Sequence, residues 1–121
     1  MTTKKTLVLG ASENPERYSN KAIRSLSQHG VEAVAVGLRK GRVGETEIQT
    51  GQPHFSEIDT VTLYLSRDNQ KPLYDYILSL KPRRIIYNPG AENAELEKLA
   101  EEKGIENLEA CTLVLLATNQ Y

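Results

Sequence analysis

Short apolar segments alternate with helix-like segments along this chain, and the alternation restricts its fold more than any other feature of the sequence. The spacing predicts five buried strands, over Thr6–Leu9, Val31–Val36, Thr60–Leu65, Arg84–Tyr87 and Ile105–Ala110. Intervening segments of this length act as right-handed crossovers between parallel strands. We therefore expect one domain over residues 1–121, a three-layer α/β sandwich with a parallel sheet of about five strands in the order 3-2-1-4-5.

Segments between these strands carry apolar residues at helical spacing. The first helix is expected from about Ser19 to His29 and the third from Glu92 to Lys103. The second helix is expected to be capped by Asp68 or Asn69, to carry Pro72 in its first turn, and to turn inward a stripe of Leu73, Ile77 and Leu80.

Two further segments are expected to form small elements. The segment from Leu38 to Ile58 is long for a connection in a compact domain, which indicates a functional loop or one with structure of its own. Within it, Thr46–Gln49 is expected to be a short extended piece. Cys111–Leu116 is expected to form a short apolar tail element.

Composition excludes several classes of protein. The chain has 15 Lys and Arg against 16 Asp and Glu, a net charge of −1 that does not favour nucleic acid. Its single cysteine excludes an intramolecular disulfide and fits a reducing compartment. No apolar run approaches the roughly 20 residues that cross a bilayer, and the N-terminus does not resemble a signal peptide. We expect a cytoplasmic protein with no membrane partner.

The turn after the first strand is the most informative motif. The strand runs directly into Gly10-Ala11-Ser12, and a polar loop then leads into a helix, which is how a parallel sheet builds a phosphate cradle. Gly10 allows a tight turn and close approach of phosphate oxygens to N–H groups, and Ser12 adds a hydroxyl donor. A G-x-G-x-x-G motif would need glycine at Ser12 and Pro15, so an ordinary NAD site is not favoured. A simple βα turn is the structural alternative.

The end of the second strand distinguishes between nucleotides. NAD-binding proteins place an acidic residue about 20 residues past the glycine motif to hold the ribose. Here Val36, Gly37 and Leu38 are followed by Arg39 and Lys40. Two cations suit an additional phosphate on the adenosine ribose, with Arg39 as a bidentate donor and Lys40 as a point charge. A solvated basic loop is the alternative.

No catalytic constellation accompanies these motifs in the sequence. His29 is expected to cap a helix C-terminus, and His54 has no metal-ligand partner at suitable spacing. Neither a Ser-His-Asp order nor a Cys-His pair is visible. Cys111, after the fifth strand, is expected to be buried, and a position facing a ligand thiol is the alternative.

These motifs together resemble a family, the small stand-alone CoA-binding proteins. The resemblance rests on Val8–Ser12 with Pro15 and Arg17, on the Ser19-Asn20 helix entry and on Asn88-Pro89-Gly90, and it covers essentially the whole chain. It implies a Rossmann-like fold similar to the CoA-binding domain of the succinyl-CoA synthetase α subunit. It also implies CoA contacts from the ends of four strands, at Gly10, Ala11, Ser12, Asn14, Arg17, Ser19, Val36, Gly37, Arg39, Lys40, Leu65, Ser66, Asn88, Pro89 and Gly90.

The sequence therefore favours a non-catalytic protein that binds CoA or acyl-CoA, with the pyrophosphate at the first βα turn and the 3′-phosphate near Arg39 and Lys40. The synthetase's phosphohistidine and ligase domains have no counterpart here. Two alternatives stay open. One is an NADP-binding oxidoreductase or regulatory nucleotide domain that uses the same cations. The other is a homodimeric interaction protein without ligand binding, with the apolar tail Leu113–Leu116 as its surface. A larger protein partner is a further expectation.

Overall fold

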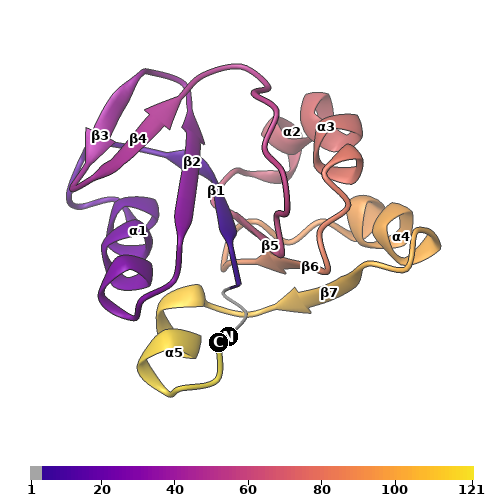
Figure 1. Cartoon of the computed structure of the whole chain (residues 1–121). Coiled ribbons are helices and arrows are strands. Elements are labelled where there is room, and N and C mark those ends of the chain that lie inside the picture. The colour runs from indigo at the N-terminus through magenta and orange to yellow at the C-terminus, as the bar shows by residue number, and fades with distance from the viewer. Residues whose placement is uncertain (1–3) are drawn as a thin grey trace.

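A seven-stranded sheet runs through the centre of the molecule (Figure 1). The structure is a computed structural model, and it describes residues 4–121. The strands lie in the order β3-β4-β2-β1-β5-β6-β7, and neighbouring strands are parallel except for β3 and β4. Their bounds are β1 Thr6–Ala11, β2 Ala33–Gly37, β3 Gly41–Val43, β4 Thr46–Gln49, β5 Thr60–Leu63, β6 Arg84–Tyr87 and β7 Glu106–Glu109.

The core lies on both faces of this sheet, because successive strand residues point to opposite sides. Leu7 and Leu9 of β1 belong to one hydrophobic cluster, together with Ile77 and Leu96. Val8, between them, belongs to a second cluster with Ile23 and others. Strands β5 and β6 are buried at every residue, as expected for parallel strands that are covered on both sides.

Helices form the outer layers (Figure 1). α1 (Tyr18–Gln28) and α5 (Thr112–Ala117) cover one face, and α1 buries Ala22, Ile23 and Leu26 there. The other face carries α2 (Arg67–Gln70), the 3-10 turn η1 (Lys71–Leu73), α3 (Tyr74–Ser79) and α4 (Ala94–Glu102). In the part of the chain that the structure describes, no helix is long and apolar enough to span a membrane.

The α/β class and all five expected strands are confirmed, but the expected strand order is wrong. The strands expected as first to fifth are β1, β2, β5, β6 and β7, and they lie in the order 2-1-3-4-5. The reason is the β3–β4 hairpin, whose second strand, the expected extended piece Thr46–Gln49, pairs with β2. This hairpin occupies the edge beside β2, so β5 pairs with the other side of β1. The order therefore reverses between β1 and β5, the kind of position beside which open α/β sheets bind ligands.

The expected cap of the second helix is also wrong. The N-cap residue is Ser66, and the segment divides into α2, η1 and α3 instead of one helix. Pro72 explains the division, because it lacks the N–H that a continuous α-helix needs at that position. The buried amide of Gln70 then holds the segment by donating to the carbonyls of Leu65 and Ala91, both at 2.8 Å.

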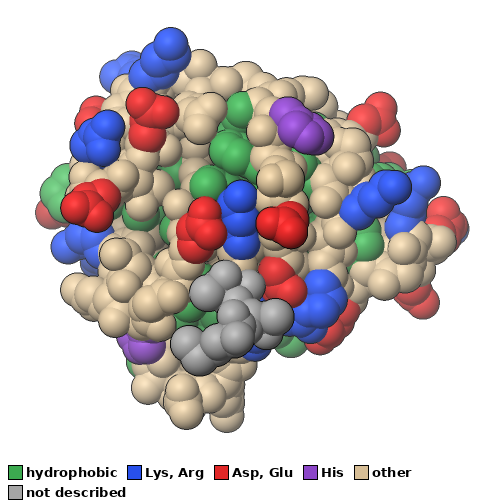
Figure 2. Space-filling model, viewed as in Figure 1, with side chains coloured by type: hydrophobic (Ala, Val, Ile, Leu, Met, Phe, Trp, Pro, Cys, Tyr) green, Lys and Arg blue, Asp and Glu red, His purple; other side chains and the backbone are tan. Residues whose placement is uncertain are grey.

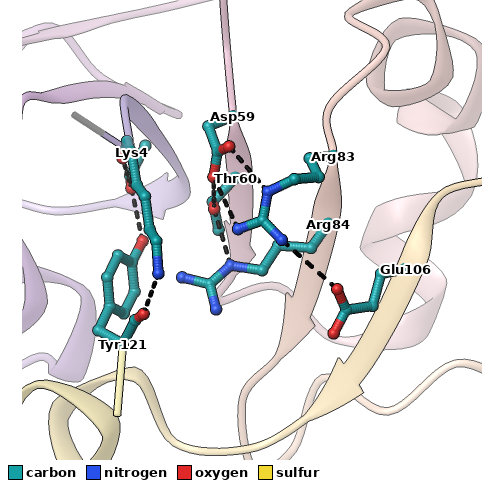
Figure 3. A network of polar contacts seen from close by, with 8 residues as sticks. Lys4, Asp59, Thr60, Arg83, Arg84, Glu106 and Tyr121 are labelled. Atoms are coloured by element: carbon teal, nitrogen blue, oxygen red, sulfur yellow. Dashed lines mark hydrogen bonds and ion pairs between the residues drawn. The ribbon is translucent and has the colours of Figure 1, made fainter. Parts of the chain in front are cut away.

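Charged side chains at the amino ends of β5, β6 and β7 pair with one another (Figure 3). The Asp59 carboxylate lies 3.0 Å from Nε of Arg83, whose Nη1 lies 3.5 Å from the Glu106 carboxylate. Burial alone would raise the pKa of Asp59, but the hydrogen bonds from Arg83 and Thr60 and the nearby positive charge outweigh it and lower the pKa below its ordinary value of 3.8. These charges are therefore satisfied within the fold.

A second cation at this edge is buried. Arg84 is 5% exposed, donates from Nε to Oγ1 of Thr60 at 2.9 Å, and holds its guanidinium 4.4 Å from the centre of the Tyr121 ring. Lys4 donates to the backbone carbonyl of Tyr121, and Thr6 shares a hydrogen bond with its hydroxyl (Figure 3). The first and last described residues of the chain are thus joined beside β1.

Candidate functional site

Gly10 lies where β1 passes closest to the end of β5. Its φ of +94° is a conformation that other residues rarely adopt, and an added Cβ would lie 2.7 Å from the carbonyl oxygen of Tyr64. The pairing of β1 with β2 also shifts between Leu9 and Ala11. Gly10 therefore lies at an irregularity inside β1, which continues to Ala11, and not in a turn after the strand as the sequence predicts. The backbone that follows β5 explains why only glycine fits there.

The loop between β1 and α1 is held by hydrogen bonds that its own side chains and Asn20 form. Oγ of Ser12 accepts a hydrogen bond from the N–H of Asn14 (3.1 Å), and Oδ1 of Asn14 accepts one from the N–H of Glu16 (3.0 Å). The buried Asn20 donates from Nδ2 to the Ser12 carbonyl (3.0 Å). The hydroxyl proton of Ser12 stays available as a donor.

Helix α1 begins without a side-chain cap. Its N-cap residue is Arg17, which makes no capping hydrogen bond, and no acidic residue stands in the first turn. The side chain of Ser19 is buried, at 3% exposure. The first N–H groups of such a helix, with the positive end of its dipole, favour an anion.

Strand β2 ends against the first loop. Ala11 pairs with Gly37, and a Cβ added at Gly37 would lie only 2.3 Å from the carbonyl oxygen of Ala11. Val36, just before, is buried at 6% exposure. The structure therefore brings the end of β2 into direct contact with the last residue of β1, just before the loop that leads to α1.

Exposed cations follow β2. Arg39 and Lys40 lie in the loop between β2 and β3, and Arg42 lies on β3. Within residues 4–121, these three side chains and Arg17 make no ion pair within 4 Å. Among the described residues, Tyr18 (66% exposed) and Leu38 (96%) are two of the three exposed large hydrophobic side chains; Leu38 lies in the loop after β2, and Tyr18 is the first residue of α1. The edge thus offers free positive charge together with apolar surface.

Glu13 is the site residue that sequence reasoning missed. Its carboxylate reaches from the first loop to β3, where Oε2 accepts a hydrogen bond from the N–H of Arg42 at 2.9 Å. A Cβ added at Gly41 would lie 2.3 Å from the carboxyl carbon of Glu13. The glycine directly after Arg39 and Lys40 was the one signal in the sequence for such a close contact.

The ends of β5 and β6 continue the carboxyl edge of the sheet on the other side of β1. Leu65 packs partly buried on the core cluster, and Ser66 is exposed at the start of α2. Pro89 and Gly90 are also exposed, and the N–H of Gly90 donates to the Glu92 carboxylate at 3.0 Å. These residues line the carboxyl edge where the sequence placed them.

Asn88 stands apart from its neighbours because it is buried, at 2% exposure. Its Nδ2 donates to Oγ1 of Thr62 (2.6 Å) and to the carbonyl of Leu63 (2.9 Å), while its Oδ1 accepts from the N–H of Thr112 (2.8 Å). The amide is fully used inside the fold, where it ties β6 to β5 and to the start of α5. Asn88 therefore supports this part of the carboxyl edge from within the fold.

Tyr64 and Cys111 follow β5 and β7, whereas His29 lies at the far end of α1, away from the candidate site. Burial raises the pKa of the Tyr64 hydroxyl to about 12, so this group stays protonated at neutral pH. Cys111 is partly buried and precedes α5. His29 ends α1 with its Nδ1 2.8 Å from the Ser25 carbonyl, in the capping position that the sequence predicts. Within residues 4–121, no three His, Cys, Asp or Glu side chains gather as a metal site.

The apolar tail packs mainly on its own molecule. Leu116 is buried at 4% exposure and joins the second core cluster, and Leu113 and Leu115 are partly buried. Val114 is 56% exposed. The homodimer that the sequence offers as an alternative stays a prediction.

Apolar side chains reach the surface beside β2. Figure 2 shows hydrophobic side chains gathered between β2 and the segment that leads from β4 to β5. Val34 of β2 and Phe55 of that segment are partly buried hydrophobic residues that pack against the first core cluster. No helix covers this segment of the described chain, which leaves apolar surface open beside the sheet.

Known proteins share this architecture. The family model described as CoA binding domain matches residues 4–117. A crystal structure of an uncharacterized protein is 46% identical, with 100% of both chains covered and a TM-score of 0.96. A Thermus thermophilus structure is 21% identical over 98% of this chain and 91% of its own, with a TM-score of 0.86. A search of curated proteins finds no match.

A larger enzyme contains a similar fold. Acetyl-coenzyme A synthetase 1 of Candidatus Korarchaeum cryptofilum is 15% identical over 88% of this chain, which corresponds to 25% of the synthetase chain, with a TM-score of 0.72. At this identity the likeness shows the fold alone. The family match, in contrast, spans nearly every described residue and confirms the resemblance that the sequence indicates. The chain therefore belongs to the CoA-binding domain family.

Proposed function

We propose that this protein binds CoA or acyl-CoA at the carboxyl edge of the sheet and catalyses no reaction on it. The observation that carries the proposal is the contact of Gly37 with Ala11. This pair joins the strand that leads to the uncapped start of α1 to the strand that leads to the cations, which supports a single ligand that contacts both. Membership of the CoA-binding domain family supports a ligand of the CoA type.

The two phosphate groups of CoA fit different parts of this edge. The pyrophosphate is assigned to the turn after β1, where the Ser12 hydroxyl and the first N–H groups of α1 are donors. The 3′-phosphate is assigned to Arg39 and Lys40, which have no ion-pair partner within the described residues. Gly10, Asn14, Arg17 and Ser19 shape the first of these positions.

Apolar surface remains for the rest of the ligand. Leu38 and Tyr18 offer exposed surface for the adenine ring near the cations, whereas Val36 is itself buried. Leu65, Ser66, Pro89 and Gly90 line the opposite wall, where the pantetheine arm and any acyl group would lie. Asn88 holds that wall through its internal hydrogen bonds and does not need to touch the ligand.

The polar groups near the carboxyl edge support a role in ligand binding and not in catalysis. The Ser12 oxygen accepts within the loop, the Asn88 amide is satisfied inside the fold, and the Tyr64 hydroxyl is held protonated by burial. Ser12 and Asn88 therefore form hydrogen bonds to the backbone, and the Tyr64 hydroxyl stays neutral. General acid–base catalysis needs a group with a pKa near the working pH.

Thermal unfolding with different nucleotides tests the proposal. CoA at 100 times its Kd is expected to stabilise the protein by about 2.7 kcal/mol, whereas NAD is expected to give no shift. Dephospho-CoA should stabilise less than CoA, because it lacks the 3′-phosphate. NADP that stabilises the protein when CoA does not would establish the oxidoreductase or regulatory alternative instead.

Two double variants locate the 3′-phosphate. Arg39→Ala/Lys40→Ala should bind CoA and dephospho-CoA with similar affinity. The control Lys98→Ala/Lys103→Ala removes two exposed cations near the end of α4 and should keep the preference for CoA. A preference for CoA that survives in the first variant would refute the assignment of the 3′-phosphate.

A further inference from the structure

An acidic side chain lies in the middle of the proposed phosphate site. Glu13 follows Ser12 in the loop between β1 and α1, and its Oε2 accepts a hydrogen bond from the backbone N–H of Arg42 at 2.9 Å. Its carboxylate is an acceptor of the same kind as a phosphate oxygen. The Glu13 carboxylate therefore takes the Arg42 N–H, a hydrogen-bond donor that an anionic ligand could use.

Gly41 makes room for this carboxylate. A Cβ at position 41 would meet the carboxyl carbon of Glu13 at 2.3 Å and its Oε2 at 2.6 Å. Gly41 does not have the left-handed φ that explains glycine at other turns of this chain, such as Gly10. Gly41 thus leaves the space in which the Glu13 side chain lies, so this side chain links the two loops.

The cations near Glu13 can attract the negative charge of a ligand in addition to that of Glu13 itself. Arg39, Lys40 and Arg42 lie on the same stretch of chain, yet within residues 4–121 the Glu13 carboxylate makes no ion pair within 4 Å and takes a backbone N–H instead. Arg39 and Lys40 remain available to a ligand, while Arg42 donates from Nη1 to the Glu45 carbonyl at 3.3 Å and its backbone N–H is occupied by Glu13. An incoming phosphate would meet both the cations and the like charge of Glu13.

We propose that Glu13 is a specificity-determining residue of the anion site: its carboxylate is an internal anion that a ligand phosphate must displace from the N–H of Arg42. This inference rests on the proposed function for the identity of the ligand. The negative charge of Glu13 repels a phosphate group at this position, so ligands that carry a phosphate here bind more weakly than they would without Glu13. Glu13 therefore lowers the affinity for CoA, which carries the 3′-phosphate, more than the affinity for dephospho-CoA, and so reduces but does not reverse the preference for CoA that Arg39 and Lys40 provide.

Charge-removing variants test the proposal. Glu13→Gln keeps the length of the side chain and an oxygen acceptor for Arg42, and removes the charge. Calorimetric titration should show CoA binding about three- to tenfold tighter than in the native protein, the size of one like-charge interaction near a protein surface. Dephospho-CoA should gain less. The control Glu16→Gln neutralises an exposed acid of the same loop that makes no contact with β3, and it should bind as the native protein does.

A direct readout follows the Arg42 amide in unliganded and liganded protein. Its NMR shift should differ between the native protein and Glu13→Ala but not between the native protein and Glu16→Ala. CoA should bring the Arg42 amide shift of the native protein and of Glu13→Ala close to one value. An Arg42 amide that keeps its Glu13-dependent shift in the CoA complex would overturn displacement.

Inorganic pyrophosphate as a third ligand separates this inference from the proposed function. If Glu13→Gln binds pyrophosphate more tightly than Glu16→Gln while no variant binds CoA, the CoA function fails and the role of Glu13 stands. If CoA binds equally to both variants, the function stands and the role of Glu13 fails. If neither ligand binds to any of the folded proteins, both fail.

Discussion

The two edges of the sheet treat charge in opposite ways. At the amino edge Arg83 pairs with Asp59 and Glu106, and Arg84 is buried against Thr60 and the Tyr121 ring (Figure 3). At the carboxyl edge Arg39 and Lys40 are exposed and, within the described residues, make no ion pair.

The difference separates charges that hold the fold from charges that are free for a ligand. A paired cation has its field neutralised by a partner a few ångströms away, whereas an unpaired one acts on whatever anion arrives. Both edges carry arginine, so residue type alone does not distinguish them. The edges differ in whether each cation has a partner within the fold, and four experiments test the difference between the two edges.

The largest effect is expected at Gly37, where the two parts of the carboxyl edge touch. Gly37→Ala should lower the free energy of unfolding by about 3 kcal/mol, because its Cβ would meet the Ala11 carbonyl at 2.3 Å. Gly44→Ala, where an added Cβ has free space, should cost only the strain of its positive φ, about 1 to 2 kcal/mol. Urea unfolding measures both. Equal losses would show that the contact of β2 with the first loop is not tight.

Asn88 tests whether every residue of the carboxyl edge is reserved for the ligand. Asn88→Ala should cost about 2 kcal/mol in urea unfolding, because it leaves the N–H of Thr112 buried without its acceptor. Asn69→Ala, on the exposed surface of α2, should cost less than about 0.5 kcal/mol. CoA affinity of the folded Asn88→Ala protein should change little. A loss of tenfold or more would place this amide against the ligand.

The cations of the two edges should respond in opposite senses. Arg39→Ala/Lys40→Ala should leave the free energy of unfolding within about 0.5 kcal/mol of the native value and weaken CoA binding about tenfold. Arg83→Ala should leave CoA affinity unchanged and cost up to about 1 kcal/mol of stability, since its ion pairs are half exposed. Denaturation and calorimetry on the same samples check both. If both variants lost free energy of unfolding and CoA affinity together, the proposed difference between the two edges would be wrong.

The smallest effect is expected from acid. The pKa of Asp59 is lower in the folded protein than in the unfolded chain, so its ionised form adds stability at neutral pH, and this is lost as the pH falls from about 4 through the folded value. The loss should be at most about 1 kcal/mol, because solvent screens the Arg83 pair. Asp59→Asn should flatten this part of the curve of stability against pH. An unchanged slope in that variant would assign the acid dependence to other carboxylates.

Local patterns of the sequence were sufficient for most elements. The expected strand Arg84–Tyr87 matches β6 at both ends, and the helix expected from Ser19 to His29 begins and ends within one residue of α1. These elements follow from apolar periodicity and from the glycine after the helix, which act over a few residues. Pro72 shows the limit: it was expected inside one helix, but it separates α2 from α3.

Strand order and the role of Glu13 could not be obtained in the same way. The order depends on which edge of the sheet remains open, and the pairing of Ile48 with Ala35 closes the edge beside β2. The Glu13 contact joins residues 29 positions apart, and each one alone looks like an ordinary surface residue. Both features are non-local pairings, which no single segment of the sequence reveals.

The bond between Lys4 and the Tyr121 carbonyl has a practical consequence. It sets both ends of the described chain side by side, beside the amino end of β1 and opposite the proposed ligand edge (Figure 1). A short linker could therefore connect the two ends, and new ends could be opened in an exposed turn such as the one at Gly44. A circularly permuted chain, or one inserted into another protein as a ligand-responsive module, would keep the carboxyl edge facing solvent.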